Sequence, residues 1–269
     1  MTTGALILAF NNEQTNYVAM AAWSARNIRR HLGIPTSIIT DCQDADQLTD
    51  FDAVISADAQ TGGTRYFDDY AQTVTWHNAG RTDVYNLTPY DRTLVLDADY
   101  VVASSDLKRV LNCSQDFMCY RRAWDMTAGV FLDGLNQFGD HNMPMWWATV
   151  MMFQKSNTAQ YIFDCMQMVK KNWQHYRDLY SIKQSNYRND YALSIALGIV
   201  SGHTLTVDEI PGPLLSLMPS VTLTHQEWPD HYSVVFTDSD NKLKTMGFSG
   251  VDFHAMGKKH LETVIASTS

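Results

Sequence analysis

Two carboxylates follow an apolar segment near the middle of the chain. Asp97 and Asp99 stand directly after Thr93–Leu96, whose apolar and β-branched residues predict an internal strand. If the chain turns after this strand, both side chains lie at the carboxyl end of a sheet, where α/β folds place their ligands. Two uncompensated carboxylates repel each other, so the pair favours a divalent cation bound through oxygen atoms. We therefore expect a metal–phosphate site; the alternative is a pair of solvated turn aspartates.

Further ligands for such a cation are found in the segment Phe253–His260. His254 is a candidate third metal ligand, because imidazole is a common metal-binding group. Gly257 permits the close approach of a backbone, and Lys258 or Lys259 could neutralise a phosphate. Without the paired aspartates as context, the same segment would be interpreted as a solvated basic turn.

The elements that must position these residues follow an alternating pattern. Apolar strands at 5–10, 36–40 and 51–55 accompany a helix at 15–31, so the chain opens with a β-α-β unit and parallel pairing. We expect further helices at 71–85, 158–173 and 190–199, and strands at 146–153, 233–237 and 245–248. No internal repeat or linker interrupts this order, which predicts an α/β protein with a single domain over residues 1–269.

Composition excludes several classes of protein. The chain has 269 residues, of which 45% are hydrophobic, enough to bury one substantial core. It has no apolar run of about 18 residues, so we expect no membrane span. Its four scattered cysteines indicate reduced thiols in a cytosolic protein. A net charge of −9 argues against binding nucleic acid over the whole surface.

One segment, 170–188, departs from this acidic average. It holds five lysines and arginines against one aspartate, with Trp173, Tyr176, Tyr180 and Tyr187 interleaved. Cations beside aromatic rings suit a phosphate backbone with stacked bases, so DNA is a candidate partner. The alternative is an amphipathic helix end whose rings pack inward and whose cations face water.

The order of these motifs resembles that of the GT-A fold glycosyltransferases, particularly glycogenin and related retaining galactosyltransferases. That family has a basic residue upstream of an Asp-x-Asp motif, and here Arg81 precedes Asp97-Ala98-Asp99. Its later motifs are similar to Trp147–Phe153, Asn189-Asp190-Tyr191 and His254-Ala255-Met256-Gly257. The resemblance extends over nearly the whole chain.

Three departures from the family's pattern bear on the substrate. Thr149 replaces a glycine, Tyr191 replaces the usual glutamine, and His260 stands where the family has a lysine. The resemblance therefore supports nucleotide-sugar chemistry better than it supports a particular sugar or stereochemical outcome.

The resemblance implies a single GT-A-like (Rossmann-like) domain with a central, mostly parallel mixed sheet flanked by helices. Its nucleotide-binding part would be about 1–103 and its acceptor side about 104–269. The implied activity is transfer of a hexosyl or pentosyl group from a nucleotide sugar, with a UDP-sugar expected, to an acceptor hydroxyl. A Mn²⁺ or Mg²⁺ cofactor held by Asp97, Asp99 and His254 would stabilise the leaving diphosphate.

The resemblance also implies the other site residues. Lys258 and Arg81 would add positive charge beside the leaving phosphate, although Arg81 could equally be a surface charge. Asp190, with Asn189, would form the catalytic part, although aspartate is also a good helix cap. The donor-binding set is completed by Phe10, Asn11, Asp41, Ala98 and Gly257. Of these, Asn11 and Asp41 follow strands, where polar residues also serve as turn formers.

Two acceptor hypotheses follow. If 170–188 contacts DNA, the acceptor could be hydroxymethylated cytosine, as in phage enzymes that glycosylate that base. Otherwise the protein would modify a glycan or a protein without DNA contact. Either hypothesis implies the cytoplasm of a bacterial or virus-infected host cell.

Three rival functions remain open. A haloacid-dehalogenase-type phosphohydrolase would use Asp97 as its nucleophile, but its motif usually continues with Gly-Thr, whereas Tyr100-Val101 follows here. A sugar-nucleotide pyrophosphorylase normally opens with a glycine-rich loop, and residues 9–12 contain no glycine. The third rival is a nucleotide-sugar-binding protein with a degenerate site, although no broken ligand is evident.

Overall fold

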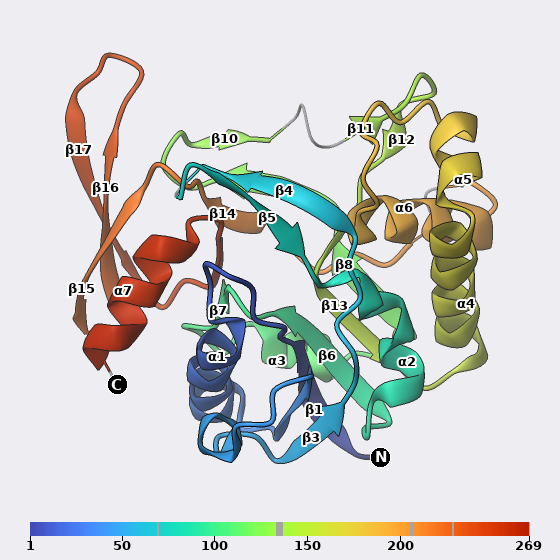
Figure 1. Cartoon of the computed structure of the whole chain (residues 1–269), viewed down its shortest axis with the longest axis horizontal. Helices are drawn as coiled ribbons and strands as arrows, with labels where there is room; N and C mark the ends of the chain where they lie inside the picture. Colours follow the sequence, from blue (N-terminus) through green and yellow to red (C-terminus); the bar gives the residue numbers. More distant parts are fainter. Residues whose placement is uncertain (69, 133–136, 205–206, 228, 269) are drawn as a thin grey trace.

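A computed structural model of the chain describes residues 1–68, 70–132, 137–204, 207–227 and 229–268. Its central sheet has six strands in the order β3-β2-β1-β6-β13-β8. Their bounds are β1 Thr3–Leu8, β2 Thr36–Thr40, β3 Ala53–Ser56, β6 Arg92–Asp97, β8 Phe117–Tyr120 and β13 Trp147–Gln154. Strands β1, β2, β3 and β6 pair in parallel, and β13 runs antiparallel to β6 and β8. The expected mixed, mostly parallel α/β sheet flanked by helices is confirmed (Figure 1).

Both faces of this sheet are apolar, because alternate residues of its strands enter two separate cores. Ala5 and Ile7 of β1 belong to the core that also holds helices α1 (Tyr17–Leu32) and α3 (Leu107–Leu111). Leu6 and Leu8 belong to the other core, with α2 (Val84–Leu87), α4 (Asn157–Lys171) and α6 (Asn189–Val200). The sheet is therefore fixed on both sides, and its strand ends are held in place.

Helix α1 is capped at both ends by residues that favour helix termini. The Asn16 side chain accepts a hydrogen bond from the Ala19 amide at its start, and Gly33 ends it with a left-handed φ of 71°. The crossover from β1 through α1 to β2 forms the β-α-β unit that the periodicity predicted.

A second sheet of five strands brings the C-terminal part of the chain to the middle. Its order is β10-β9-β14-β18-β7. The bounds are β7 Tyr100–Val101, β9 Ala123–Asp125, β10 Val130–Phe131, β14 Leu214–Leu217 and β18 Phe253–Ala255. Because β18 pairs antiparallel with β7, His254 lies opposite Tyr100, one residue beyond Asp99. The division of the chain near residue 103 stays a prediction, since this sheet takes strands from both sides of it.

The segment between β3 and β6 differs from its expected structure. A helix at 71–85 was predicted, but β4 (Gly63–Phe67) and β5 (Gln72–Trp76) form an antiparallel hairpin there. Only a 3₁₀ turn, Ala79–Asp83, and α2 follow it. The prediction was wrong because Thr73–Trp76 is β-branched and aromatic, a composition that favours strands. This hairpin lies over the carboxyl ends of the central strands (Figure 1).

The remaining elements lie outside the two sheets described above. They are a 3₁₀ turn Ala45–Leu48, β11 Gln137–Phe138, β12 Met143–Pro144, α5 Trp173–Leu179, β15 Thr222–Glu227, β16 His231–Thr237, β17 Leu243–Ser249 and α7 Lys258–Thr268. Strands β15 to β17 form a separate antiparallel sheet that projects to one side (Figure 1). Helix α7 was not among the helices expected from the sequence. Among the described helices, none is both long and apolar enough to cross a bilayer.

Candidate functional site

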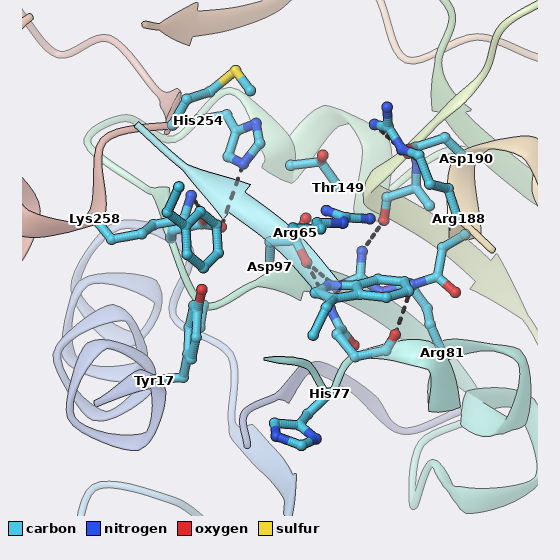
Figure 2. Close-up of a pocket in the computed structure, with 18 of the residues that line it drawn as sticks. Tyr17, Arg65, His77, Arg81, Asp97, Thr149, Arg188, Asp190, His254 and Lys258 are labelled. Carbon is cyan, nitrogen blue, oxygen red and sulfur yellow. Dashed lines mark hydrogen bonds and ion pairs between the residues drawn. The ribbon is translucent and has the colours of Figure 1, made fainter. Parts of the chain in front are cut away.

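A pocket of about 480 Å³ lies where β1 and β6 end, under the β4–β5 hairpin (Figure 2). Leu8 and Asp97 line it from the ends of β1 and β6, Phe10 lines it from the segment after β1, and His254 and Lys258 line it from the C-terminal part. This is the edge of an α/β sheet at which ligands bind, because several strands end there together.

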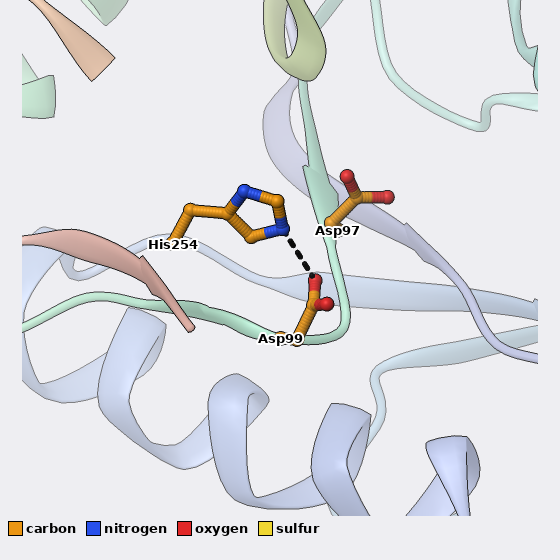
Figure 3. A group of neighbouring side chains, drawn as sticks. All are labelled: Asp97, Asp99 and His254. Atoms are coloured by element: carbon orange, nitrogen blue, oxygen red, sulfur yellow. Dashed lines mark ion pairs between the residues drawn. The ribbon is translucent and has the colours of Figure 1, made fainter. Parts of the chain in front are cut away.

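One wall of the pocket carries the two carboxylates and the imidazole that the sequence singled out. One ligand atom from each of Asp97, Asp99 and His254 lies within 4.8 Å of the others (Figure 3). The backbone explains this arrangement: β6 ends at Asp97, the chain turns, and the Ala255 amide donates to the Asp99 carbonyl at 3.0 Å. The His254 Nε2 atom lies 3.4 Å from Asp99 Oδ1. The turn and the β7–β18 pairing together build the cluster.

The Asp97 carboxylate is held by a buried guanidinium. Arg81 is only 1% exposed, and its Nη2 atom pairs with Asp97 Oδ1 while its Nη1 atom donates to the Ala148 carbonyl. Asn78 Nδ2 donates to the same Asp97 oxygen at 3.2 Å. Burial raises the pKa of Asp97 above its ordinary value, even though Arg81 beside it acts in the opposite direction. Arg81 thus fixes the orientation of Asp97.

Asp99 is paired with the first residue of α7. The Lys258 ammonium contacts Asp99 Oδ2 and also donates to the Ala255 carbonyl at 2.9 Å. Burial alone would raise the pKa of Asp99, but Lys258 and His254 hold it well below its usual range. Asp99 is therefore ionised at neutral pH.

These residues fit a divalent cation. Two ligands of one Mg²⁺, each about 2.1 Å from the ion, lie roughly 3 to 4 Å from each other. The ligand atoms of Asp97, Asp99 and His254 lie within 4.8 Å of one another, so small side-chain rotations would bring them to that separation. Carboxylate oxygens suit Mg²⁺ and Mn²⁺, and the buried His254 Nδ1 atom has no hydrogen-bond partner among the described residues. The Lys258 ammonium, seated on Asp99, shows that this wall attracts positive charge.

The predicted catalytic pair lies at the start of α6, across the pocket from His254. Asp190 Oδ1 accepts from the Ala148 amide at 3.0 Å, and its Oδ2 atom pairs with Arg188 at 2.8 Å. Burial, the largest single effect, would raise the pKa of Asp190, but Arg188, the Ala148 amide and Arg65 together outweigh it and the net shift is downward. Asn189 also lines the pocket, and its Nδ2 atom donates to the Asn78 carbonyl at 2.7 Å. Asn189 thus supports Asn78, which contacts Asp97.

The other predicted donor ligands divide into two groups. Phe10 and Ala98 line the pocket, whereas Asn11, Asp41 and Gly257 are not among the described residues that line it. The Asn11 carboxamide accepts from the Val18 amide at 3.0 Å, and Asp41 is exposed. The assignment of these three residues as donor ligands stays a prediction that their placement does not support.

The hairpin supplies pocket residues that the sequence did not suggest. Arg65 of β4 and Trp76 of β5 line the cavity, and the Arg65 guanidinium lies 4.1 Å from the centre of the Trp76 ring. Tyr17, at the start of α1, lines it as well. No strand had been expected between residues 55 and 71, so only the β-branched and aromatic composition of β5 could have indicated the hairpin.

The aromatic rings of 170–188 pack largely against the protein. Trp173 Nε1 donates to the Ser185 carbonyl at 2.8 Å, and the Trp173 ring is stacked with Tyr191 at 6.0 Å between centroids. Tyr187 is buried. This arrangement matches the inward-packed alternative, and nothing in the described residues supports a DNA-binding platform.

No protein-family model matches the chain, and no curated protein matches it. Similar solved structures are glycosyltransferases, the class that the motifs resemble. An active-site mutant of LgtC, a galactosyltransferase, has 13% identity and a TM-score of 0.49, covering 77% of this chain and 72% of that chain. GlyE of Streptococcus pneumoniae has 12% identity and a TM-score of 0.40, covering 78% and 45%. Mouse xyloside xylosyltransferase 1 has 11% identity and a TM-score of 0.44, covering 77% and 85%.

Proposed function

We propose that this protein is a metal-dependent glycosyltransferase that moves a sugar from a UDP-sugar to an acceptor hydroxyl. The observation that carries this proposal is the cluster of Asp97, Asp99 and His254 on one wall of a pocket at the carboxyl ends of parallel strands. Asp190 stands on the opposite wall, so a metal–diphosphate and the sugar attached to it would fit between the two.

The residue types match the charges that the reaction creates. Breaking the bond between the sugar and the diphosphate leaves negative charge on the phosphate and positive charge on the sugar. Asp97, Asp99 and His254 would hold Mn²⁺ or Mg²⁺, which as a Lewis acid stabilises the leaving group by several kcal/mol. Lys258 adds a fixed positive charge on the same wall.

Asp190 supplies the complementary negative charge. Because Arg188 lowers its pKa against the effect of burial, Asp190 is ionised at neutral pH. An ionised carboxylate beside the sugar would stabilise its oxocarbenium-like state or orient its hydroxyls. Asn189 acts here as a positioning residue, through Asn78.

The contacts described above also bear on the class of acceptor and on the rival phosphohydrolase function. Because the rings of 170–188 pack inward, we favour an acceptor on a glycan or a protein over hydroxymethylated cytosine in DNA. No observation favours a phosphohydrolase, since one oxygen of Asp97 is already held by Arg81 and Asn78.

A thermal-shift screen of nucleotide sugars with and without Mn²⁺ tests this proposal. A UDP-sugar at about a hundredfold excess over its Kd should stabilise the fold by about 2.7 kcal/mol, and the shift should require Mn²⁺. Asp99→Asn should lose the shift, whereas Asp106→Asn should keep it, because the Asp106 side chain is 73% exposed and lies outside the pocket lining. No shift with any UDP-sugar would contradict the proposal.

A further inference from the structure

Arg65 is the one cation in the described pocket lining that has no carboxylate of its own. The other three are paired one to one: Arg81 with Asp97, Lys258 with Asp99, and Arg188 with Asp190. Within the described part of the chain, the Arg65 guanidinium makes no ion pair and no hydrogen bond, and its contact is the face of Trp76. Asp68 also lines the pocket, but it is exposed and forms no ion pair with Arg65.

The hairpin holds this guanidinium in a fixed place. The Trp76 ring lies over the backbone of Gly62, where an added Cβ would stand 1.9 Å from a ring carbon, so only glycine leaves room for it. Trp76 in turn stacks against Arg65 at 4.1 Å. Figure 2 shows Arg65 in the middle of the pocket, with Asp97 on one side and Arg188 and Asp190 on the other.

The surroundings of Arg65 disfavour an unpaired positive charge. Burial, followed by repulsion from Arg188, lowers the pKa of Arg65 from its ordinary value to about 10, so it remains charged at neutral pH. Three further donor atoms of pocket-lining residues have no partner among the described residues: the indole Nε1 of Trp147 and the Nε atoms of Arg81 and Arg188. The pocket lining therefore offers donors that an anionic acceptor group would satisfy.

The diphosphate does not account for Arg65. In the function proposed above, a divalent cation balances the two charges of the diphosphate, and the three ion pairs balance themselves. Arg65 lies between the metal wall and Asp190 (Figure 2), and although Asp190 and Asp97 attract it, each of these carboxylates already has a cation of its own. That position corresponds to the sugar of the donor, since the sugar must lie between the diphosphate and Asp190.

We propose that Arg65 binds a carboxylate on the transferred sugar, so that the donor is a nucleotide-linked uronic acid. This inference rests on the proposed function, because it assumes a donor diphosphate on the metal wall. A guanidinium binds a carboxylate through two parallel hydrogen bonds, which a neutral hydroxymethyl group cannot match. Arg65 is thus the residue that selects an acidic sugar over its neutral counterpart.

Binding of matched donor pairs by calorimetry in Mn²⁺ tests this inference. UDP-glucuronate is compared with UDP-glucose, and UDP-galacturonate with UDP-galactose, because each pair differs only at C6. We expect one uronate to bind wild-type protein about tenfold more tightly than its neutral partner. Arg65→Gln should abolish that preference while leaving the neutral sugar within about twofold, Arg65→Lys should keep part of it, and Arg109→Gln, at a side chain 85% exposed, should keep all of it.

Three outcomes would overturn the inference, in distinguishable ways. Equal binding of both members of each pair by wild-type protein would remove the acidic sugar and leave the proposed function intact; an effect of Arg65→Gln on acceptor KM alone would then assign the anion to the acceptor. An equal loss for the acidic and neutral donors in Arg65→Gln would assign Arg65 to the diphosphate. Failure of all four donors to bind, together with no thermal shift for any other UDP-sugar, would contradict the proposed function itself.

Discussion

At the scale of single residues, the pocket is organised by ion pairs that orient its carboxylates. Replacing Lys258 by methionine would leave Asp99 buried with only His254 beside it. Removing one partner of a buried pair costs about 3 to 5 kcal/mol, so we expect a loss of that size in urea unfolding. Adding Mn²⁺ should stabilise the Lys258→Met variant more than wild-type protein, because the cation replaces the missing charge. The exposed neighbour provides the control, Lys259→Met, which should behave as wild type.

An equal response of the Lys258→Met variant and wild-type protein to Mn²⁺ would count against Asp99 as a ligand. The sequence identified Asp97, Asp99 and His254 because the paired carboxylates follow a buried strand and the C-terminal segment offers a matching imidazole. It did not identify Arg65, since an arginine in a polar segment has no local signal and becomes a pocket residue only through the β4–β5 pairing. Likewise, it could not show that Arg81 is buried against Asp97.

At the scale of elements, the loop between β17 and β18 is tied to the end of β7 by a carboxylate. Asp252 Oδ1 accepts from the Ala103 amide at 2.7 Å, and burial raises the pKa of Asp252 to about 6. The folded state therefore binds a proton more tightly than the unfolded chain, whose aspartate pKa is about 3.9. The free energy of unfolding should fall as pH rises from about 4 to 6 through this group.

Asp252→Asn tests this pH dependence, because asparagine keeps the accepting oxygen without the charge. Urea unfolding between pH 4 and 7 should show a weaker decline in stability for the variant than for wild-type protein. Parallel curves for the two proteins would mean that Asp252 does not titrate in this range.

The elements themselves were predictable where periodicity and end signals agreed. Helix α1 ends at Leu32, one residue beyond the predicted end, and β2 occupies Thr36–Thr40 as expected from the sequence. The helix predicted at 71–85 was wrong because hairpin pairing, which is not visible locally, decides how Thr73–Trp76 folds. The pairing of β7 with β18, which completes the metal cluster, also joins segments that no local pattern connects.

At the scale of the whole molecule, two sheets converge on one pocket. The central sheet supplies Asp97 from β6, and the second sheet carries His254 on β18 to the same wall. The hairpin over the strand ends adds Arg65, and α6 adds Asp190. The class of reaction could be proposed from the sequence because the motifs that contain Asp97, Asp99 and His254 can be recognised there. The preference for an acidic sugar could not be proposed from the sequence, because it depends on where the β4–β5 hairpin places Arg65.

The most direct test of this account is the release of UDP from a UDP-sugar, measured with and without Mn²⁺. Wild-type protein should release UDP only with the metal, and Asp97→Ala and Asp99→Ala should each lower the rate by about a hundredfold or more while the folded CD spectrum is retained. Asp106→Asn should match wild type. Full rates in both alanine variants, or undiminished release by wild-type protein in excess EDTA, would contradict the claim that these two carboxylates hold a catalytic metal.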